Sequence, residues 1–259
     1  MENELLSKVG RYEFLAEPFH CDFSSRLFMG HLGNHMLNAA DFHSNDRGYG
    51  MNYLMPCHKT WVLSRLAIEM EEMLQSYDKF FVETWVESVM RYFTSRNFAV
   101  CGADGKVYGY GRSIWAMIDT ESRQPVDILA VRDGLIKEYI ETEKPCPIQP
   151  SSRVKMGKEA ELVRSIDTYY SDVDVNGHIN SVKYIEHILD LFDLDFYREH
   201  RLQRFEIAYV AESHQGDRLE FYREQVGEEE YCIKIIKVCK NTGENVEVVR
   251  SKAKFVKNC

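Results

Sequence analysis

The sequence lacks the features of a membrane or secreted protein. It has no uninterrupted run of about 18 apolar residues, the length that a transmembrane helix needs. The amino terminus, MENELLSKVG, has no basic stretch followed by an apolar segment, as a signal peptide would. The seven cysteines are odd in number, scattered and never in a CxxC pair, which argues against a disulfide framework or a zinc site. We therefore expect a cytoplasmic protein with free, mostly buried thiols.

Acidic residues outnumber basic ones, 41 to 32. The formal net charge of −9 argues against general nucleic-acid binding, which needs a basic surface. The exception is the segment 231–259, where seven basic and two acidic residues give +5, leaving −14 for residues 1–230. An acidic partner could dock on this segment. Alternatively, its lysines only alternate with apolar residues along half-solvated strands.

Proline is rare, and its distribution divides the chain. Three of the six prolines fall within residues 143–153, EKPCPIQPSSR, a composition that cannot continue a helix or a central strand. We predict an N-terminal domain over residues 1–142, a linker over 143–158 and a C-terminal domain over 159–259. Each domain has an ordinary size for a small globular unit.

The same order of elements is predicted on both sides of this linker. In the first part the aromatic segment 12–27 is typical of a strand, and Leu32, Met36 and Ala40 have helical spacing within 32–42. Strands follow at 61–70, 81–93 and 107–118, with a tight GADG turn at 102–105. In the second part we expect a strand at 161–170, an apolar helical stripe at 179–192, and strands at 204–213, 218–226, 231–240 and 244–256. The repeated order predicts an α+β duplication.

Residues 172–178, DVDVNGH, are the most distinctive motif. The pattern D-x-D-x-N-G resembles the start of an EF-hand calcium loop. The twelfth position of that loop, counted from Asp172, is Lys183, where calcium needs a bidentate glutamate. A lysine ammonium would repel the ion, and the sequence has no second such loop. We therefore do not expect calcium.

Two interpretations of this motif stay open on spacing alone. Asn176 and Gly177 suit a helix cap, because an asparagine oxygen accepts from the unpaired N–H groups of a first turn. His178 would then stand at the helix start, near two carboxylates, where the positive end of the helix dipole keeps an imidazole neutral and able to act as a base. The first interpretation is structural, and the second describes an active site.

The segment 172–190, DVDVNGHINSVKYIEHILD, resembles the catalytic segment of acyl-acyl-carrier-protein thioesterases, the FatA and FatB type of plants with bacterial counterparts. In that family an aspartate, an asparagine and a histidine at alternate positions precede a helix with a tyrosine in its second turn. The strand 204–213 lies where the family has a catalytic glutamate followed by cysteine. The matching residues are Asp174, Asn176, His178, Asn180, Tyr184 and Glu212, with Ser213 at the cysteine position.

The N-terminal part is similar to the same family in DFHSNDRGYG, TWV, RNF and RSIWAMI, so the resemblance covers most of the chain. It implies a tandem double hotdog fold, in which each half is a long helix wrapped by an antiparallel sheet. The first half would form the acyl-chain tunnel. The implied reaction is hydrolysis of fatty acyl-acyl-carrier protein in fatty acid biosynthesis, with acyl carrier protein as partner, no cofactor and no stable membrane insertion. A homodimer is left open.

The resemblance also implies roles for four residues. Glu212 and His178 would polarise water, and Asn176 would position the thioester or donate to its oxyanion. Asp174 would orient the histidine or asparagine, or itself attack the carbonyl. Because an unactivated serine is a poor nucleophile, Ser213 favours carboxylate and imidazole chemistry over attack by a thiol.

Three further interpretations of the sequence concern metal binding and alternative functions. His31, His35 and His43 could be mistaken for a metal cluster, but the sequence has no HExxH motif, so no metal is expected. An acyl-coenzyme A thioesterase or a hotdog dehydratase is an alternative enzyme, although the catalytic set argues against the dehydratase. A non-catalytic acyl-binding protein of the same fold is the alternative outside the enzymes.

Overall fold

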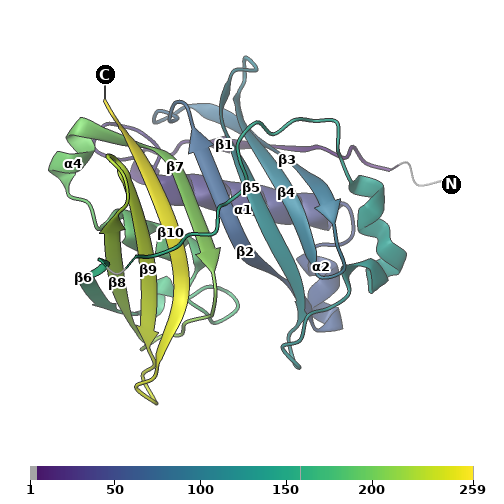
Figure 1. Cartoon of the computed structure of the whole chain (residues 1–259). Helices are drawn as coiled ribbons and strands as arrows, with labels where there is room; N and C mark the ends of the chain where they lie inside the picture. The colour runs from purple at the N-terminus through teal and green to yellow at the C-terminus, as the bar shows by residue number, and fades with distance from the viewer. Residues whose placement is uncertain (1–4, 158, 259) are drawn as a thin grey trace. The chain divides into compact units, whose positions relative to one another are not determined.

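The computed structural model describes residues 5–157 and 159–258. Two compact units divide the chain (Figure 1): an N-terminal unit of Met1–Ser64 with Glu71–Pro150, and a C-terminal unit of Arg65–Met70 with Ser151–Cys259. The break at Pro150 falls in the proline-rich segment. The predicted boundaries at 142 and 159 stay a prediction, and the inclusion of residues 65–70 in the C-terminal unit was not foreseen.

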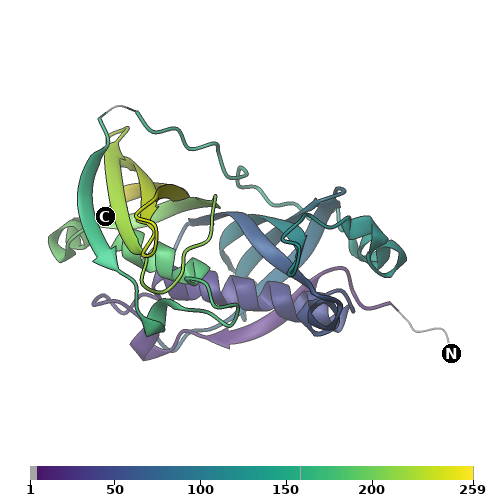
Figure 2. The same ribbon diagram turned by 90° about the horizontal axis from the view of Figure 1, so that it is seen from below.

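Antiparallel strands and one long helix make the N-terminal unit. Strand β1 pairs with β3, β3 with β4, and β4 with β5, all antiparallel. Helix α1 packs against β3 and β1, and Figure 2 shows it lying beside the strands of this unit. The main elements are β1 (Gly10–Leu15), α1 (Met29–Asp46), β2 (Lys59–Met70), β3 (Lys79–Val89), β4 (Phe93–Gly102) and β5 (Val107–Asp119). Shorter helices are η1 (Pro18–His20), α2 (Met51–Leu54), η2 (Met55–Cys57) and η3 (Ile128–Tyr139).

Helix α1 is longer than the predicted 32–42. Its predicted apolar face is buried. His43 and Ser44 are buried as well, although they are polar and lie beyond the predicted end of the helix. The Ser44 hydroxyl donates to the Ala40 carbonyl at 2.8 Å, and His43 accepts from or donates to the Tyr49 hydroxyl at 3.1 Å. Buried polar groups with internal partners extend a helix without the desolvation cost of unpaired ones. The buried face therefore continues past the apolar stripe.

Two strand predictions in this unit were wrong. The predicted strand 12–27 ends at Leu15, because Pro18 begins the short helix η1 and cannot donate to a ladder. The segment 81–93 belongs to two strands: β3 ends at Val89, and a hairpin in which Met90 N donates to Phe93 O leads into β4. The whole of β4 was missed. The GADG turn is confirmed, with Gly105 at φ 85°.

The C-terminal unit repeats this order with a shorter helix. Its strands follow the order β7-β10-β9-β8-β6, all antiparallel, and residues Arg65 to Glu69 of β2 pair along β7. The strands predicted at 218–226, 231–240 and 244–256 are confirmed to within two residues. The elements are β6 (Glu161–Asp167), η4 (Tyr170–Asp172), α3 (Ser181–Leu189), α4 (Leu194–Glu199), β7 (His200–Tyr209), β8 (Arg218–Gln225), β9 (Glu230–Val238) and β10 (Asn245–Lys257).

Two boundaries in this unit differ from prediction in ways that matter for the site. The helix expected over 179–192 begins only at Ser181. The strand expected over 204–213 ends at Tyr209, so Glu212 lies on the loop beyond it. A short helix, α4, was not foreseen.

The structure also bears on cysteines and membranes. The six cysteines among the described residues are free, as predicted, and Cys259 lies outside them. Half of these six are buried. Within residues 5–157 and 159–258, no helix is long and apolar enough to cross a bilayer.

Candidate active site

A tight turn at residues 172–180, the His178 turn, carries three of the predicted site residues. Asp174 Oδ1 accepts from the backbone N–H of Asn176 at 2.8 Å and from that of His178 at 3.3 Å. The turn is closed by Gly177 N donating to Asp174 O at 3.0 Å and by Asp174 N donating to His178 O at 2.8 Å. Gly177 has φ 80°, the left-handed region in which glycine is least strained. Asp174 therefore positions the backbones of Asn176 and His178.

The predicted relation between this turn and the helix was wrong in detail. Helix α3 begins at Ser181, and its N-cap is Asn180, whose side chain accepts from Val182 N at 2.9 Å. Asn176 is not the cap. His178 precedes the cap and lies outside the first helical turn, so it does not stand at the helix start as expected.

A second loop at residues 211–217, the Glu212 loop, lies against the His178 turn. Ile179 N donates to Ser213 O at 2.9 Å, which joins the two segments through their backbones. Lys237 Nζ donates to Glu212 O at 2.6 Å. The Glu212 carbonyl is therefore fixed by a lysine on β9.

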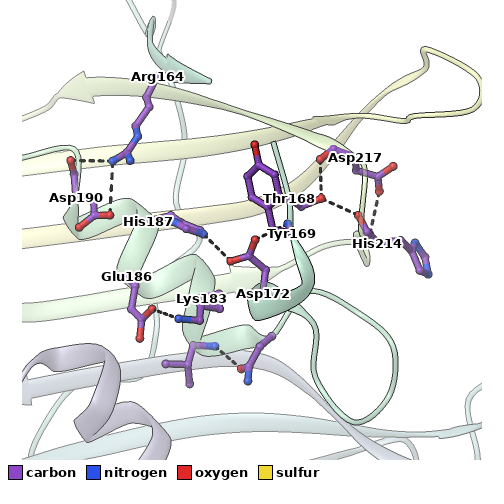
Figure 3. Close-up of polar contacts among 12 residues, drawn as sticks. Arg164, Thr168, Tyr169, Asp172, Lys183, Glu186, His187, Asp190, His214 and Asp217 are labelled. Carbon is purple, nitrogen blue, oxygen red and sulfur yellow. Dashed lines mark hydrogen bonds and ion pairs between the residues drawn. The ribbon is translucent and has the colours of Figure 1, made fainter. Parts of the chain in front are cut away.

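The rest of the Glu212 loop is held by two buried polar residues (Figure 3). Asp217 Oδ2 accepts from His214 N at 2.9 Å. Thr168 Oγ1 donates to His214 O at 3.1 Å and to Asp217 O at 2.8 Å, a shared donor. Both Thr168 and Asp217 are buried, which makes these bonds costly to lose.

His178 and Glu212 meet where the two loops touch. His178 Nε2 lies 3.3 Å from Glu212 Oε2, and the two side chains are 24% and 35% exposed. Both groups are therefore within reach of a water or a substrate. The ring of His214 stands edge-on to that of His178, with centroids 5.0 Å apart.

A buried ion-pair partner supports the start of the His178 turn (Figure 3). His187 Nε2 on α3 lies 3.3 Å from Asp172 Oδ1, and Asp172 Oδ2 accepts from Tyr169 N at 2.8 Å. The Asp172 carbonyl accepts from Asn180 N at 2.8 Å. Asp172 thus ties the turn to the helix that follows it.

Ser213, at the position of the family's cysteine, is buried. Only 1% of it is exposed, and its hydroxyl lies beside that of Tyr184, which is also buried. Burial raises the pKa of the Tyr184 phenol, so this hydroxyl stays protonated. A nucleophile must reach the substrate carbonyl, and a hydroxyl enclosed in this way does not.

In the structure, the two aspartates of the calcium-like pattern have different partners. Asp172 faces His187, and Asp174 accepts from backbone N–H groups, so their oxygens do not converge. Lys183 lies on α3 and pairs with Glu186 at 2.7 Å (Figure 3).

The three N-terminal histidines named in the sequence analysis lie in two groups of contacts. His31 stacks on His20 with ring centroids 3.9 Å apart, and His35 Nε2 lies 3.7 Å from Glu17. His43 contacts Tyr49 and the backbone of Lys8. His31 and His35 thus both lie near the pair formed by His20 and Glu17, whose side chains are 3.2 Å apart, whereas His43 has other partners.

The sequence analysis named residues that lie together in the structure, but it did not name Lys237 or His214. It named His178 and Glu212, which the structure joins, and Asp174, which braces the turn. Asn176 is exposed at the tip of the turn. His214 could have been noticed from its spacing two residues after Glu212. Lys237 carried no signal, because its contact with Glu212 spans 25 residues.

The fold and the site together define the class. Two antiparallel units, each with a helix against its strands, confirm the predicted α+β tandem hotdog. The chain superposes on the 12:0-ACP thioesterase of Umbellularia californica with a TM-score of 0.84, covering 98% of this chain and 100% of that one at 18% identity, a likeness of fold alone.

The sequence matches the acyl-ACP thioesterase N-terminal domain over residues 8–139 and the acyl-ACP thioesterase C-terminal domain over residues 156–255. This chain belongs to the acyl-ACP thioesterase family. It is 51% identical to an acyl-ACP thioesterase of Bacteroides thetaiotaomicron of known structure, covering 96% of this chain and 98% of that one, with a TM-score of 0.88.

A plant relative extends this comparison. The chain is 26% identical over 192 residues to the chloroplastic palmitoyl-acyl carrier protein thioesterase of Gossypium hirsutum. That match covers 70% of this chain and 46% of the plant protein, so the chain spans about half the length of the curated relatives it matches.

Proposed function

We propose that this protein hydrolyses the thioester of fatty acyl-acyl-carrier protein and releases a free fatty acid and the holo-carrier protein in fatty acid biosynthesis. Family membership supports the reaction class. The observation that carries the proposal is the contact between His178 Nε2 and Glu212 Oε2, 3.3 Å apart on two loops with braced backbones. A partly exposed imidazole beside a carboxylate is suited to take a proton from water.

In the proposed mechanism, water is activated between these two groups. Glu212 and His178 polarise a water molecule, which attacks the thioester carbonyl. The proton from water passes to this pair and then to the departing thiolate. Both side chains thereby return to the protonation they had before the reaction. Preorganised groups are effective here because they need no rearrangement as the charge develops.

Asn176 and Asp174 receive different parts. We assign to the exposed Asn176 side chain the donation of a hydrogen bond to the thioester oxygen, where negative charge develops. Asp174 already accepts two backbone N–H bonds, at 2.8 and 3.3 Å. We therefore assign it the bracing of the turn, and we favour direct attack by water over a covalent carboxylate intermediate.

The acyl chain and the carrier protein complete the proposal. We propose that the N-terminal domain, residues 1–142, holds the acyl chain. The basic residues of 231–259 are partly used within the chain: Lys252 pairs with Glu230 at 2.6 Å, Arg250 with Glu247 at 2.6 Å, and Lys237 with the Glu212 carbonyl. This favours the interpretation as half-solvated strands over a docking surface. A steep loss of kcat/KM with added salt would instead favour the interpretation of this segment as a docking surface.

The test is thiol release from a panel of acyl-carrier-protein and acyl-coenzyme A thioesters of graded chain length. We expect release from carrier-protein thioesters, and loss of release in Glu212→Gln. His58→Gln is the matched control, because His58 also lies 3.3 Å from a carboxylate, that of Glu121, in the N-terminal unit. Absence of release from every thioester would refute the proposal that this protein is a thioesterase. A marked preference for coenzyme A thioesters would identify them as the substrate instead. Full activity in Glu212→Gln would show that the catalytic site lies elsewhere.

A further inference from the structure

Two histidines and a carboxylate meet at the surface of the C-terminal unit. His178, Glu212 and His214 each offer one atom that can ligate a metal ion, and these atoms all lie within 4.8 Å of one another. Imidazole nitrogen and carboxylate oxygen are the ligands that zinc takes besides thiolate. His178 and Glu212 belong to the proposed hydrolytic site, whereas His214 has no assigned part in hydrolysis.

One pair of these atoms already has the spacing of zinc ligands. Two atoms at about 2.1 Å from an ion and at a tetrahedral angle are about 3.4 Å apart. His178 Nε2 and Glu212 Oε2 are 3.3 Å apart. His214 is exposed, so its ring can rotate toward the pair without disturbing a packed core. Only one of the three side chains then needs to move.

The backbones that carry these side chains are fixed. Lys237 holds the Glu212 carbonyl at 2.6 Å, and Asp217 holds the N–H of His214 at 2.9 Å. Asp174 accepts from the N–H of His178 at 3.3 Å. Fixed backbones reduce the ordering cost of bringing ligands together, which raises affinity.

The number of ligands indicates the kind of site. Structural zinc sites are closed by four protein ligands, whereas three leave a position for water. Among residues 5–157 and 159–258, this is the one group of three or more histidine, cysteine or acidic side chains with such spacing. It is partly exposed, so an ion can enter and leave.

From this geometry we propose that His178, Glu212 and His214 form a reversible inhibitory site for a divalent transition-metal ion of the zinc class. The ion replaces the contact between His178 and Glu212, takes the one free lone pair of the imidazole and one lone pair of the carboxylate, and opposes proton uptake by the other carboxylate oxygen through its positive charge. The pair then cannot take a proton from water, so hydrolysis stops while the ion is bound. The inhibition rests on the proposed function, whereas binding of the ion does not.

The test compares wild type with His214→Gln, after the protein has been treated with a chelator. Glutamine keeps the N–H that Asp217 holds and removes the imidazole. His58→Gln is the control, since His58 and Glu121 form a pair without a second histidine. Zinc binding is measured by calorimetry, Co²⁺ binding by visible absorption, and hydrolysis by thiol release.

We expect wild type and His58→Gln to bind one ion per chain and to lose activity over the same zinc concentrations, with recovery on chelation. His214→Gln should retain activity without zinc and bind zinc about 100-fold more weakly. Unchanged zinc affinity in His214→Gln, or no calorimetric binding in wild type, would overturn the site. Activity that vanishes on chelation and returns with zinc would overturn the claim that the bound ion is inhibitory. If no thioester is hydrolysed, calorimetry and Co²⁺ absorption still decide the site.

Discussion

The two units contain the same turn, but only one carries the proposed catalytic side chains. In the N-terminal unit, residues 21–27 form what we call the Arg26 turn. Asp22 Oδ1 accepts from Ser24 N at 2.8 Å and from Arg26 N at 3.0 Å, as Asp174 does in the His178 turn. Asp22 N donates to Arg26 O at 2.8 Å, and Ser25 N donates to Asp22 O at 2.9 Å. Ser25 has φ 60°, the counterpart of Gly177.

The second loop is also repeated. Leu27 N donates to Leu74 O at 2.9 Å, as Ile179 N does to Ser213 O. Asp78 Oδ2 accepts from Gln75 N at 2.8 Å, as Asp217 does from His214. Leu74 thus occupies the place of Ser213 and Gln75 that of His214, which puts Met73 in the place of Glu212.

This difference separates scaffold from chemistry. An arginine and a methionine stand where the C-terminal unit has His178 and Glu212, so the N-terminal unit keeps the backbone of the site without its acid–base groups. The duplication predicted from element order is therefore visible in individual hydrogen bonds. It also shows that DVDVNGH is first of all a turn sequence, and that its function depends on the side chains it presents.

The largest expected effect comes from exchanging one residue between the two turns. His178→Arg should lower kcat/KM about a thousandfold, because arginine cannot accept a proton from water. Arg26→His should leave kcat/KM unchanged within a factor of two. Thiol release measures both, and thermal melts should coincide with wild type. Equal losses in the two variants would mean that the N-terminal turn also takes part in hydrolysis.

Lys237 is expected to act as a positioning residue for Glu212. Lys237→Met removes the donor to the Glu212 carbonyl and should lower kcat by about tenfold with little change in KM, since misplacement of a catalytic group affects the chemical step. Lys237→Arg keeps a donor and should recover most of kcat. The melts of these variants should remain close to that of wild type. A rise in KM with unchanged kcat would contradict a positioning role.

The aspartates of the two turns provide a matched pair for stability. Asp174→Ala and Asp22→Ala each leave backbone N–H groups without their acceptor and should each cost about 1–2 kcal/mol in the free energy of unfolding. Only Asp174→Ala should also lower kcat/KM, because only that turn carries the histidine. Urea unfolding and thiol release measure the two effects. Equal activity in both variants would argue against a bracing role for Asp174.

The smallest expected effect is a difference in acid sensitivity. Burial, followed by the nearby Arg96 and Arg47, lowers the pKa of His43 in the N-terminal unit from 6.5 to about 2. The unfolded chain therefore binds a proton below pH 6.5 that the folded unit does not, so stability falls as pH falls. Between pH 7.5 and 5.5 this costs about 1.4 kcal/mol.

Hydrogen exchange of α1 peptides at the two pH values measures this loss, with α3 peptides of the C-terminal unit as the internal reference. His43→Gln should reduce the pH dependence in α1, whatever its effect on stability at pH 7.5. An α1 response to pH that is the same in wild type and in His43→Gln would exclude His43 as the cause.

Strand β4 shows where prediction from sequence failed. Arg96 and Asn97 are 4% and 1% exposed, so β4 is buried on both faces and lacks the alternation that marks a half-exposed strand. Its charged and amide residues resemble a loop in sequence. Their burial depends on partners in other elements, such as the Ser44 hydroxyl, which accepts from Arg96 at 3.0 Å. No local pattern contains that information.

The sequence by itself determined the order of strands and helices, the family, and the turn that presents His178, because each of these depends on residues close together in the chain. Tertiary structure alone decided that Glu212 lies on a loop beyond β7, that Ser213 is buried, and that Lys237 and His214 surround the pair. The physical reason is sheet register. Contacts between distant residues are fixed by how strands pair, and the pairing depends on the packing of the whole unit.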